Sequence, residues 1–171
     1  MSKHTSDSLL NYLDTLGIRT TTHHHPAVYT VEESRALRGD LGGAHCKNLF
    51  LKDKKDKLWL AITYEHRPVD LKSLQKVIGS AHLSFGKPEL LQQVLGVEPG
   101  SVTALAAIND DERRVTFVLD RDLLAEAQLN FHPLVNTAST QISVDDLMKF
   151  FRATGHEPLV VAFPEAQARS E

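Results

Sequence analysis

Apolar residues recur at helical spacing in several parts of this chain. The first such segment, around Leu9, Leu13 and Leu16, predicts a helix over 8–16 that ends at Gly17. Capping residues before apolar runs predict four more helices. These are 30–38 with the capping box Thr30–Glu33, 71–78 between Asp70 and Gly79, 88–95 between Pro88 and Gly96, and 143–155 between Ser143 and Gly155.

Other apolar runs are short and are bounded by turn residues, which predicts strands. They cover 19–24, 45–52, 58–63, 102–108, 115–119, 129–132, 137–142 and 159–163. The polar runs at 53–56 and 109–112 predict two hairpin turns. Strands joined partly by hairpins, with helices between them, indicate an α+β fold with a mixed or antiparallel sheet.

The length of 171 residues fits one domain over 1–171, with a frayed tail at about 164–171. The net charge of −3 argues against a strongly basic nucleic-acid binder, but it leaves room for a local basic patch. No apolar run approaches the roughly 18–20 residues of a membrane-spanning helix, and the N-terminus does not resemble a signal peptide. With a single cysteine, the expected location is the reducing cytoplasm.

Lys47 is the first residue whose placement suggests chemistry. In a strand over 45–52 its side chain points the same way as Leu49 and Leu51, toward an apolar face. A buried lysine is costly unless it is paired or lies in a cleft, although a lysine near a strand end can also extend to solvent. Asn48 falls on the opposite face and could still reach the rim of a pocket.

His45 and Cys46 invite a Cys–His nucleophile, but neighbouring strand residues point to opposite faces. A buried, unreactive Cys46 is the favoured interpretation. The run His23–His25 does not fit a metal site, because consecutive residues cannot all face one ion and no HExxH motif accompanies them. His25 could instead line a pocket. His66, His82 and His156 are expected to be solvated.

His132 is a stronger candidate, because it ends a predicted strand just before Pro133. Hydrogen-bonding residues at a strand end are typical of binding sites and equally typical of capped turns, so both interpretations stay open.

A tight turn precedes Gly100, Ser101, Val102 and Thr103. Such a loop can present backbone N–H groups to a carbonyl or an oxyanion. It lacks the Gly-Lys-Ser/Thr sequence of a phosphate-binding loop. The acidic run at 110–112 is expected to be a solvated hairpin turn. Lysines at 52, 54, 55, 57, 72, 76 and 87 could contact phosphates or could simply be solvated.

Several segments together resemble one known family. The most specific is His45-Cys46-Lys47-Asn48-Leu49-Phe50-Leu51-Lys52-Asp53, which resembles the strand signature of the YbaK/ProRS-associated domain. That family includes the editing insertion domain of bacterial prolyl-tRNA synthetases and freestanding relatives that remove alanine from mischarged tRNA(Pro). The similarity runs from about Leu9 to Phe163 and also takes in 25–33, 84–85, 96–103, 108–110, 130–134 and 154–158.

The resemblance implies a single α+β domain around a mixed, mostly antiparallel, barrel-like sheet with surrounding helices. It implies metal-independent, cofactor-free hydrolysis of the ester that joins an amino acid to tRNA. Lys47 matches the family's functional lysine, His132 a pocket histidine, and Gly100 to Thr103 the glycine loop that contacts the aminoacyl group. Ala104 stands where the family usually has proline, which leaves the loop's rigidity open.

The implied substrate is the acceptor end of tRNA(Pro) carrying a wrong amino acid, most simply alanine. A pocket shaped for proline excludes a smaller residue by only about 1–3 kcal/mol, so a second site is needed. Val28, Tyr29 and Phe50 are candidate walls of that second site, with Asn48, Ser101, Val102 and Thr103 also in contact with substrate.

Prolyl-tRNA synthetase is a further candidate partner, and neither DNA nor a membrane is expected. Three alternatives stay open: a deacylase for cysteine or another small amino acid, a non-catalytic module that binds tRNA ends, and a histidine-dependent metalloenzyme.

Overall fold

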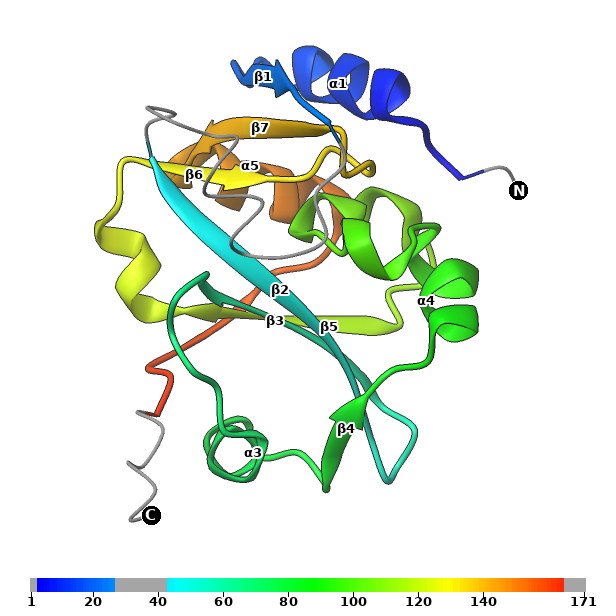
Figure 1. Ribbon diagram of the computed structural model, residues 1–171, viewed down its shortest axis with the longest axis vertical. Coiled ribbons are helices and arrows are strands. Elements are labelled where there is room, and N and C mark those ends of the chain that lie inside the picture. Colours follow the sequence, from blue (N-terminus) through cyan, green and yellow to red (C-terminus); the bar gives the residue numbers. More distant parts are fainter. Residues whose placement is uncertain (1–2, 27–42, 165–171) are drawn as a thin grey trace.

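The computed structural model describes residues 3–26 and 43–164 (Figure 1). In these ranges the chain forms one eight-stranded sheet with helices packed around it. The strands are β1 (Thr21–His24), β2 (Ala44–Asp53), β3 (Leu58–Tyr64), β4 (Leu83–Phe85), β5 (Val115–Asp120), β6 (Gln128–Phe131), β7 (Ala138–Ser143) and β8 (Leu159–Val161). The helices are α1 (Ser6–Thr15), α3 (Leu71–Ile78), α4 (Pro88–Leu95) and α5 (Val144–Thr154), with 3₁₀ turns η1 (Pro99–Ser101), η2 (Ala104–Asn109) and η3 (Arg121–Ala125).

The strand order is β1-β7-β6-β2-β3-β5-β8, and β4 pairs with β2 outside this path. The pairs β2–β6, β3–β5 and β5–β8 are parallel, and the other four are antiparallel. The predicted α+β fold with a mixed, mostly antiparallel sheet is therefore confirmed. The sheet is not closed, because the short strands β1 and β8 end it on opposite sides, so the barrel-like expectation is corrected to an open sheet.

Two apolar cores lie on opposite faces of β3, which is why nearly every residue of that strand is buried. Leu58, Leu60 and Ile62 point into a main core that α1, α4 and α5 complete. Trp59 and Ala61 alternate with them and face a second core. That second core consists of Leu51, Trp59, Ala61, Leu74, Leu83, Val118 and Phe163. In Figure 1, α1 and α3 lie at opposite ends of the molecule.

Two helices begin and end as their capping residues predict. Asp70 accepts a hydrogen bond from the Lys72 amide at the start of α3, and Gly79 ends that helix with φ of 72°. The helix α4 begins at Pro88 and ends at Gly96 in the same left-handed conformation. The helix predicted at 30–38 lies outside the described residues. None of the described helices combines the length and apolar character needed to cross a bilayer.

The strand predicted at 102–108 is wrong. Residues 104–109 form the 3₁₀ turn η2. The Thr103 hydroxyl caps the start of this turn by accepting a hydrogen bond from Leu105 N at 3.2 Å. A short buried apolar run has no periodicity that separates a strand from a helical turn. The hairpin partner expected for β5 is therefore absent from that position, and β5 pairs in parallel with β3 instead. The sequence patterns also missed β4.

His156 and Asp110 are buried rather than solvated, which corrects two further predictions. Each is at most 5 % exposed, and His156 Nε2 lies 2.9 Å from Asp110 Oδ2. Asp110 also accepts hydrogen bonds from the amides of Arg114 and Val115. This pair links the segment after α5 to the connection that precedes β5. His66 and His82, by contrast, are exposed as predicted.

Candidate functional site

Lys47 lies on β2, half-buried, opposite Thr63 of β3. Strand alternation gives it the same face as Leu49 and Leu51, as the sequence predicts. Burial lowers the pKa of Lys47 below the ordinary lysine value, and the nearby negative charge of Glu65 opposes that shift. The ammonium group is therefore held in a partly dry site with one acidic neighbour to support its charge.

Glu65 reaches this position through the register of β2 and β3. Its amide donates to the carbonyl of His45 at 2.9 Å, just beyond the last paired residues of the two strands. Glu65 lies in the turn that follows β3, and its negative charge raises the pKa of Lys47. Sequence patterns did not single out Glu65, since only the strand register shows which carboxylate lies beside the lysine.

The acidic side chain of Asp120, also near this face, is already satisfied. It accepts a hydrogen bond from the Thr63 hydroxyl at 2.6 Å and pairs with Arg67 at 2.5 Å. Arg67 compensates this buried carboxylate, whereas Glu65 is the acidic group that raises the pKa of Lys47.

His132 belongs to the same face of the sheet as Lys47. β6 runs parallel to β2 with Asn130 beside His45, while Leu129 and Phe131 point into the main core. Alternation therefore turns Asn130 and His132 away from the main core, to the face that carries Lys47. Two residues beyond the pair of His45 and Asn130, Lys47 and His132 follow on the same face, and the charge of Glu65 raises the pKa of both groups.

The His132 ring has a defined hydrogen-bonding role. Its Nδ1 lies 3.1 Å from the carbonyl oxygen of Ala138. Since a carbonyl only accepts, Nδ1 must carry the hydrogen. Burial lowers the pKa of His132, with His25 adding to the decrease, although the Ala138 bond and Glu65 oppose it. The ring is therefore neutral near pH 7 and presents Nε2 as a hydrogen-bond acceptor.

His25 completes one side of this polar face. Its Nε2 lies 3.0 Å from the hydroxyl of Ser139 on β7, and its amide donates to the Thr137 carbonyl. The sequence predicts that His25 could line a pocket. In the structure His25 adds to the lowering of the His132 pKa.

β3 pairs with one edge of β2 along most of its length. On the other edge, Lys47 and Asn48 lie in a stretch that pairs with no strand of the described ranges. On that edge β6 pairs with residues 44–45 and β4 pairs with residues 51–53. The Asn48 side chain points to the face opposite Lys47, and its buried Oδ1 has no hydrogen-bond partner among residues 3–26 and 43–164. A buried carbonyl oxygen without a donor lowers stability, which favours a ligand that supplies one.

A cavity of about 440 Å³ opens where β2 begins and β3 ends, and Lys47, Asn48 and His132 do not line it. It shares His45 and Glu65 with the face described above. Gly43 lines it in a left-handed conformation, with φ of 85°, where a Cβ would meet the Asn130 side chain and Gln128. The remaining lining residues are Ala44, Tyr64, His66 and Glu126.

In the segment from Gly100 to Thr103, the first two residues belong to η1, and Val102 and Thr103 connect η1 to η2. Ser101 and Thr103 are buried, whereas Gly100 and Val102 are half-buried. The amide of Ser101 donates to the Glu98 carbonyl at 2.8 Å, so it serves the turn itself. Thr103 caps η2 through its hydroxyl. The substrate-contacting role of these four residues stays a prediction.

The three predicted pocket walls have different outcomes. Val28 and Tyr29 lie outside the described residues. Phe50 is only 4 % exposed and packs in the main core, with its ring against Gly86. Its role as a wall stays a prediction.

Cys46 is not an activated nucleophile. Burial raises the pKa of its thiol to about 12, which keeps it protonated at neutral pH. It packs against the main core, on the opposite face from Lys47. By solvent exposure Cys46 is half-buried, so the predicted full burial is corrected, and its role as an unreactive residue stays a prediction.

Comparison with known proteins identifies the family to which this chain belongs. Residues 25–150 match the model of the aminoacyl-tRNA editing domain. The chain belongs to the aminoacyl-tRNA editing domain family. Within the described part of this family member, no three His, Cys, Asp or Glu side chains are grouped so as to hold a metal ion. The matched span contains Lys47, Glu65 and His132.

Curated relatives of this editing-domain chain cover most of its length. It is 40% identical over 157 residues to "Prolyl-tRNA synthetase associated domain-containing protein 1" of Danio rerio, covering 91% of this chain and 85% of the relative. It is 33% identical over 157 residues to "Prolyl-tRNA editing protein ProX" of Acetoanaerobium sticklandii, covering 91% and 96%.

A solved structure of a candidate trans-editing enzyme for prolyl tRNA synthetase shares the fold. Its TM-score is 0.73 at 21% identity, over 96% of this chain and all of the other.

Proposed function

We propose that this chain is a trans-editing deacylase that hydrolyses the ester between alanine and tRNA(Pro). The observation that carries the proposal is the placement of Lys47 and His132 on one face of the sheet by strand register, in a member of an aminoacyl-tRNA editing family. The relative named as a prolyl-tRNA editing protein supports the choice of tRNA(Pro).

The reaction needs charge stabilisation more than it needs a protein nucleophile. Water attacks the ester carbonyl carbon, and negative charge develops on the carbonyl oxygen. The charged Lys47 would stabilise that oxygen in its partly dry site, where electrostatic interactions are stronger than in water. The ester C–O bond then breaks, the ribose oxygen takes up a proton, and alanine and tRNA are released.

His132 and Glu65 would act around this step. The Nε2 acceptor of His132 suits a hydrogen bond from the attacking water or from a ribose hydroxyl. Glu65 would keep Lys47 protonated. The Gly100–Thr103 loop would contact the aminoacyl group, whereas Asn48, on the opposite face of β2 from Lys47, would contact a more distant part of the substrate. The proposed reaction needs no metal or cofactor, and the proposed location is the cytoplasm, with prolyl-tRNA synthetase as a candidate partner.

The test is a deacylation panel with purified protein and tRNA(Pro) carrying alanine, cysteine or proline, with and without EDTA. We expect alanine to be released fastest, proline slowly, and EDTA to change neither rate. The Lys47→Ala variant should lose about 100-fold or more in kcat/KM, as expected when a group that stabilises the oxyanion is removed.

Lys149→Ala is the matched control, since Lys149 is an exposed lysine on α5. Full activity of Lys47→Ala would overturn the role of Lys47. Rapid release of proline would overturn the editing function, and binding of tRNA without turnover would indicate a binding module instead.

A further inference from the structure

Phe85 is an aromatic side chain in an unusual position. It is 64 % exposed, the most exposed of the large apolar side chains in the described ranges and the one aromatic ring among those exposed by more than about a third. It ends β4, a strand of three residues that pairs with β2. Single exposed apolar residues need no explanation by themselves, so the surroundings of Phe85 decide its meaning.

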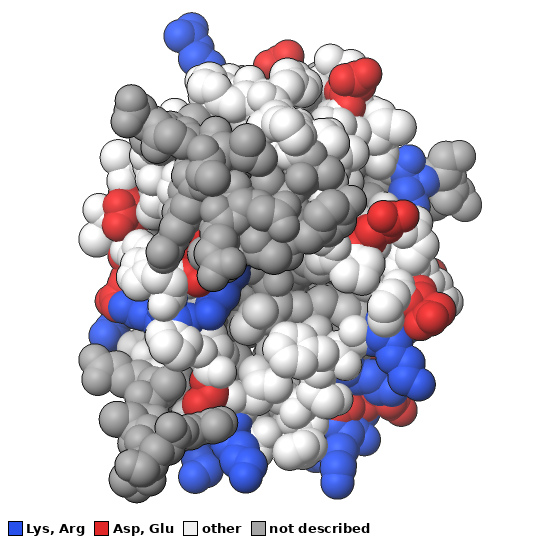
Figure 2. All heavy atoms as spheres, in the orientation of Figure 1, with Lys and Arg blue, Asp and Glu red and all other residues white. Residues whose placement is uncertain are grey.

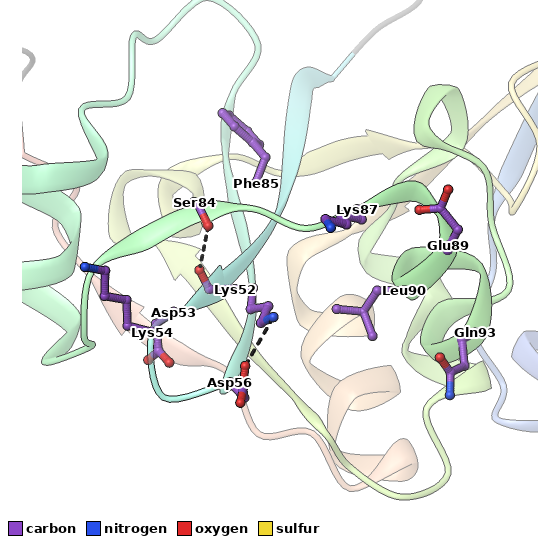
Figure 3. A pocket seen from close by; sticks show the side chains of 10 residues that line it. All are labelled: Lys52, Asp53, Lys54, Asp56, Ser84, Phe85, Lys87, Glu89, Leu90 and Gln93. Atoms are coloured by element: carbon purple, nitrogen blue, oxygen red, sulfur yellow. Dashed lines mark hydrogen bonds and ion pairs between the residues drawn. The ribbon is translucent and has the colours of Figure 1, made fainter.

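Those surroundings are rich in lysine. Phe85 lines a cavity of about 580 Å³ together with Lys52, Lys54 and Lys87. Figure 3 shows Phe85 projecting away from the other lining side chains, with Lys54 on one side of it and Lys87 on the other. In Figure 2, Lys and Arg atoms gather at the lower right, over the region of β4 and the β2–β3 turn, with some acidic atoms among them.

The acidic residues of this cavity neutralise only part of its positive charge. Asp53 is buried and accepts hydrogen bonds from the Trp59 indole and from neighbouring amides. Asp56 pairs with Lys52 at 3.1 Å. Lys54 and Lys87 are exposed, and neither pairs with an acidic residue in the described ranges, which leaves two ammonium groups available to an anion.

Phe85 lies on the same face of the sheet as Lys47. Its register partner on β2 is Leu51, and Leu51 points to the same side as Lys47. The four residues from Lys47 to Leu51 span about 13 Å of extended strand. One nucleic-acid strand advances about 3.4 Å per stacked nucleotide. The distance therefore corresponds to about four nucleotides counted from an ester held at Lys47.

We propose that Phe85 is a stacking platform for a base of the acceptor end, at about the fourth nucleotide counting the aminoacylated one as the first, and that Lys54 and Lys87 bind the adjoining phosphates. The proposal rests on the proposed function, since an RNA ester at Lys47 sets the path of the strand. Phe85 and the two unpaired lysines line one cavity at the edge formed by β4, with the ring projecting away from the lysine side chains (Figure 3). An exposed aromatic ring near unpaired cations is the combination that binds unpaired nucleotides. The net charge of −3 then matters little, because the positive charge is local.

The first measurement is binding of an uncharged RNA minihelix that ends in a single-stranded acceptor sequence, followed by fluorescence anisotropy. Removing one stacked aromatic side chain weakens binding of single strands by about 5- to 150-fold. We expect a Kd increase in this range for Phe85→Ala. The control is Leu159→Ala, another exposed apolar residue, which should leave Kd unchanged. The variant Lys54→Ala/Lys87→Ala should flatten the salt dependence of binding, and Lys149→Ala should not.

The second measurement compares deacylation of alanyl-tRNA(Pro) with that of an alanyl trinucleotide, which is too short to reach Phe85. We expect Phe85→Ala to lower kcat/KM for the full tRNA by the same factor as binding, and to leave the trinucleotide rate unchanged. Equal Kd values for wild-type protein and Phe85→Ala would overturn the inference. A loss on both substrates would do the same, because it would place Phe85 in the reacting site.

The two proposals fail in different ways. If the wild-type protein hydrolyses no ester but binds RNA in a Phe85-dependent manner, the proposed function is wrong and the stacking surface stands. If the ester is hydrolysed while Phe85→Ala matches wild type in both assays, the surface is wrong and the deacylase stands.

Discussion

Lys47 carries its charge at a position where burial opposes charge. Burial lowers its pKa, and Glu65 counters part of that effect. His132 is placed differently, because its bond to Ala138 fixes the tautomer and leaves Nε2 as an acceptor. One side chain thus supplies positive charge, which Glu65 supports, and the other supplies a neutral acceptor, which burial favours and Glu65 opposes.

The Glu65→Gln variant tests this dependence. Glu65 raises the pKa of Lys47, so removing its charge should lower that pKa further. If the protonated lysine is the active form, the high-pH limb of kcat/KM should move toward lower pH, while Lys47→Ala should lose activity at every pH. The measurement is a pH–rate profile on alanyl-tRNA(Pro). Glu157→Gln, at an exposed position, should keep the wild-type profile, and an unmoved limb in Glu65→Gln would contradict the assigned role.

The residue that follows β4, Gly86, lies directly against the ring of Phe50 on β2. The Gly86 amide donates to the Phe50 carbonyl at 2.9 Å, which anchors the end of β4 to β2. A Cβ at position 86 would collide with Cδ2 and Cε2 of Phe50. Glycine is therefore required here for close approach rather than for its backbone angles.

The Gly86→Ala variant should be less stable than wild type by about 1–3 kcal/mol, the usual cost of overpacking. The free energy of unfolding from urea titration measures this. Because the clash involves the ring, adding Phe50→Leu to Gly86→Ala should cost less than the two single changes together. Strict additivity of the two effects would show that the ring is not the cause.

The whole molecule depends on links between distant segments as well as on its two cores. The buried pair of Asp110 and His156 ties residues that are 46 positions apart. Burial alone would raise the pKa of Asp110, but hydrogen bonds from His156, Val115 and Arg114 outweigh it and lower the pKa below the usual value. The ionised carboxylate is therefore part of the stable fold.

The Asp110→Ala variant should lose about 3 kcal/mol of stability at pH 7, because it leaves buried donors without an acceptor. Since the folded-state pKa of Asp110 lies below its unfolded value, its contribution is present above that unfolded value and is lost as pH falls through the folded one. The difference from wild type in urea titrations should therefore shrink at pH 3. Asp111→Ala, at an exposed position, should have little effect, and a constant difference across pH would contradict the account.

Local sequence determined most of the elements. Caps and stops such as Asp70, Gly79 and Gly96 act within a few residues, so they set α3 and α4 without help from the rest of the chain. Alternation along β2 likewise places the side chains of Lys47 and Cys46 on opposite faces, whatever strand pairs with β2. The family resemblance, carried by specific motifs around Lys47, was also present in the sequence itself.

The tertiary structure decided which residues meet. The run at 102–108 became a 3₁₀ turn because its neighbours bury it without a strand partner, and Asp110 became buried because His156 returns to it from after α5. Glu65 lies beside Lys47, and Phe85 on the same face, through strand register alone. Hydrophobic pattern reports the local period of the chain, whereas pairing between distant strands depends on packing and backbone hydrogen bonds that no local window contains.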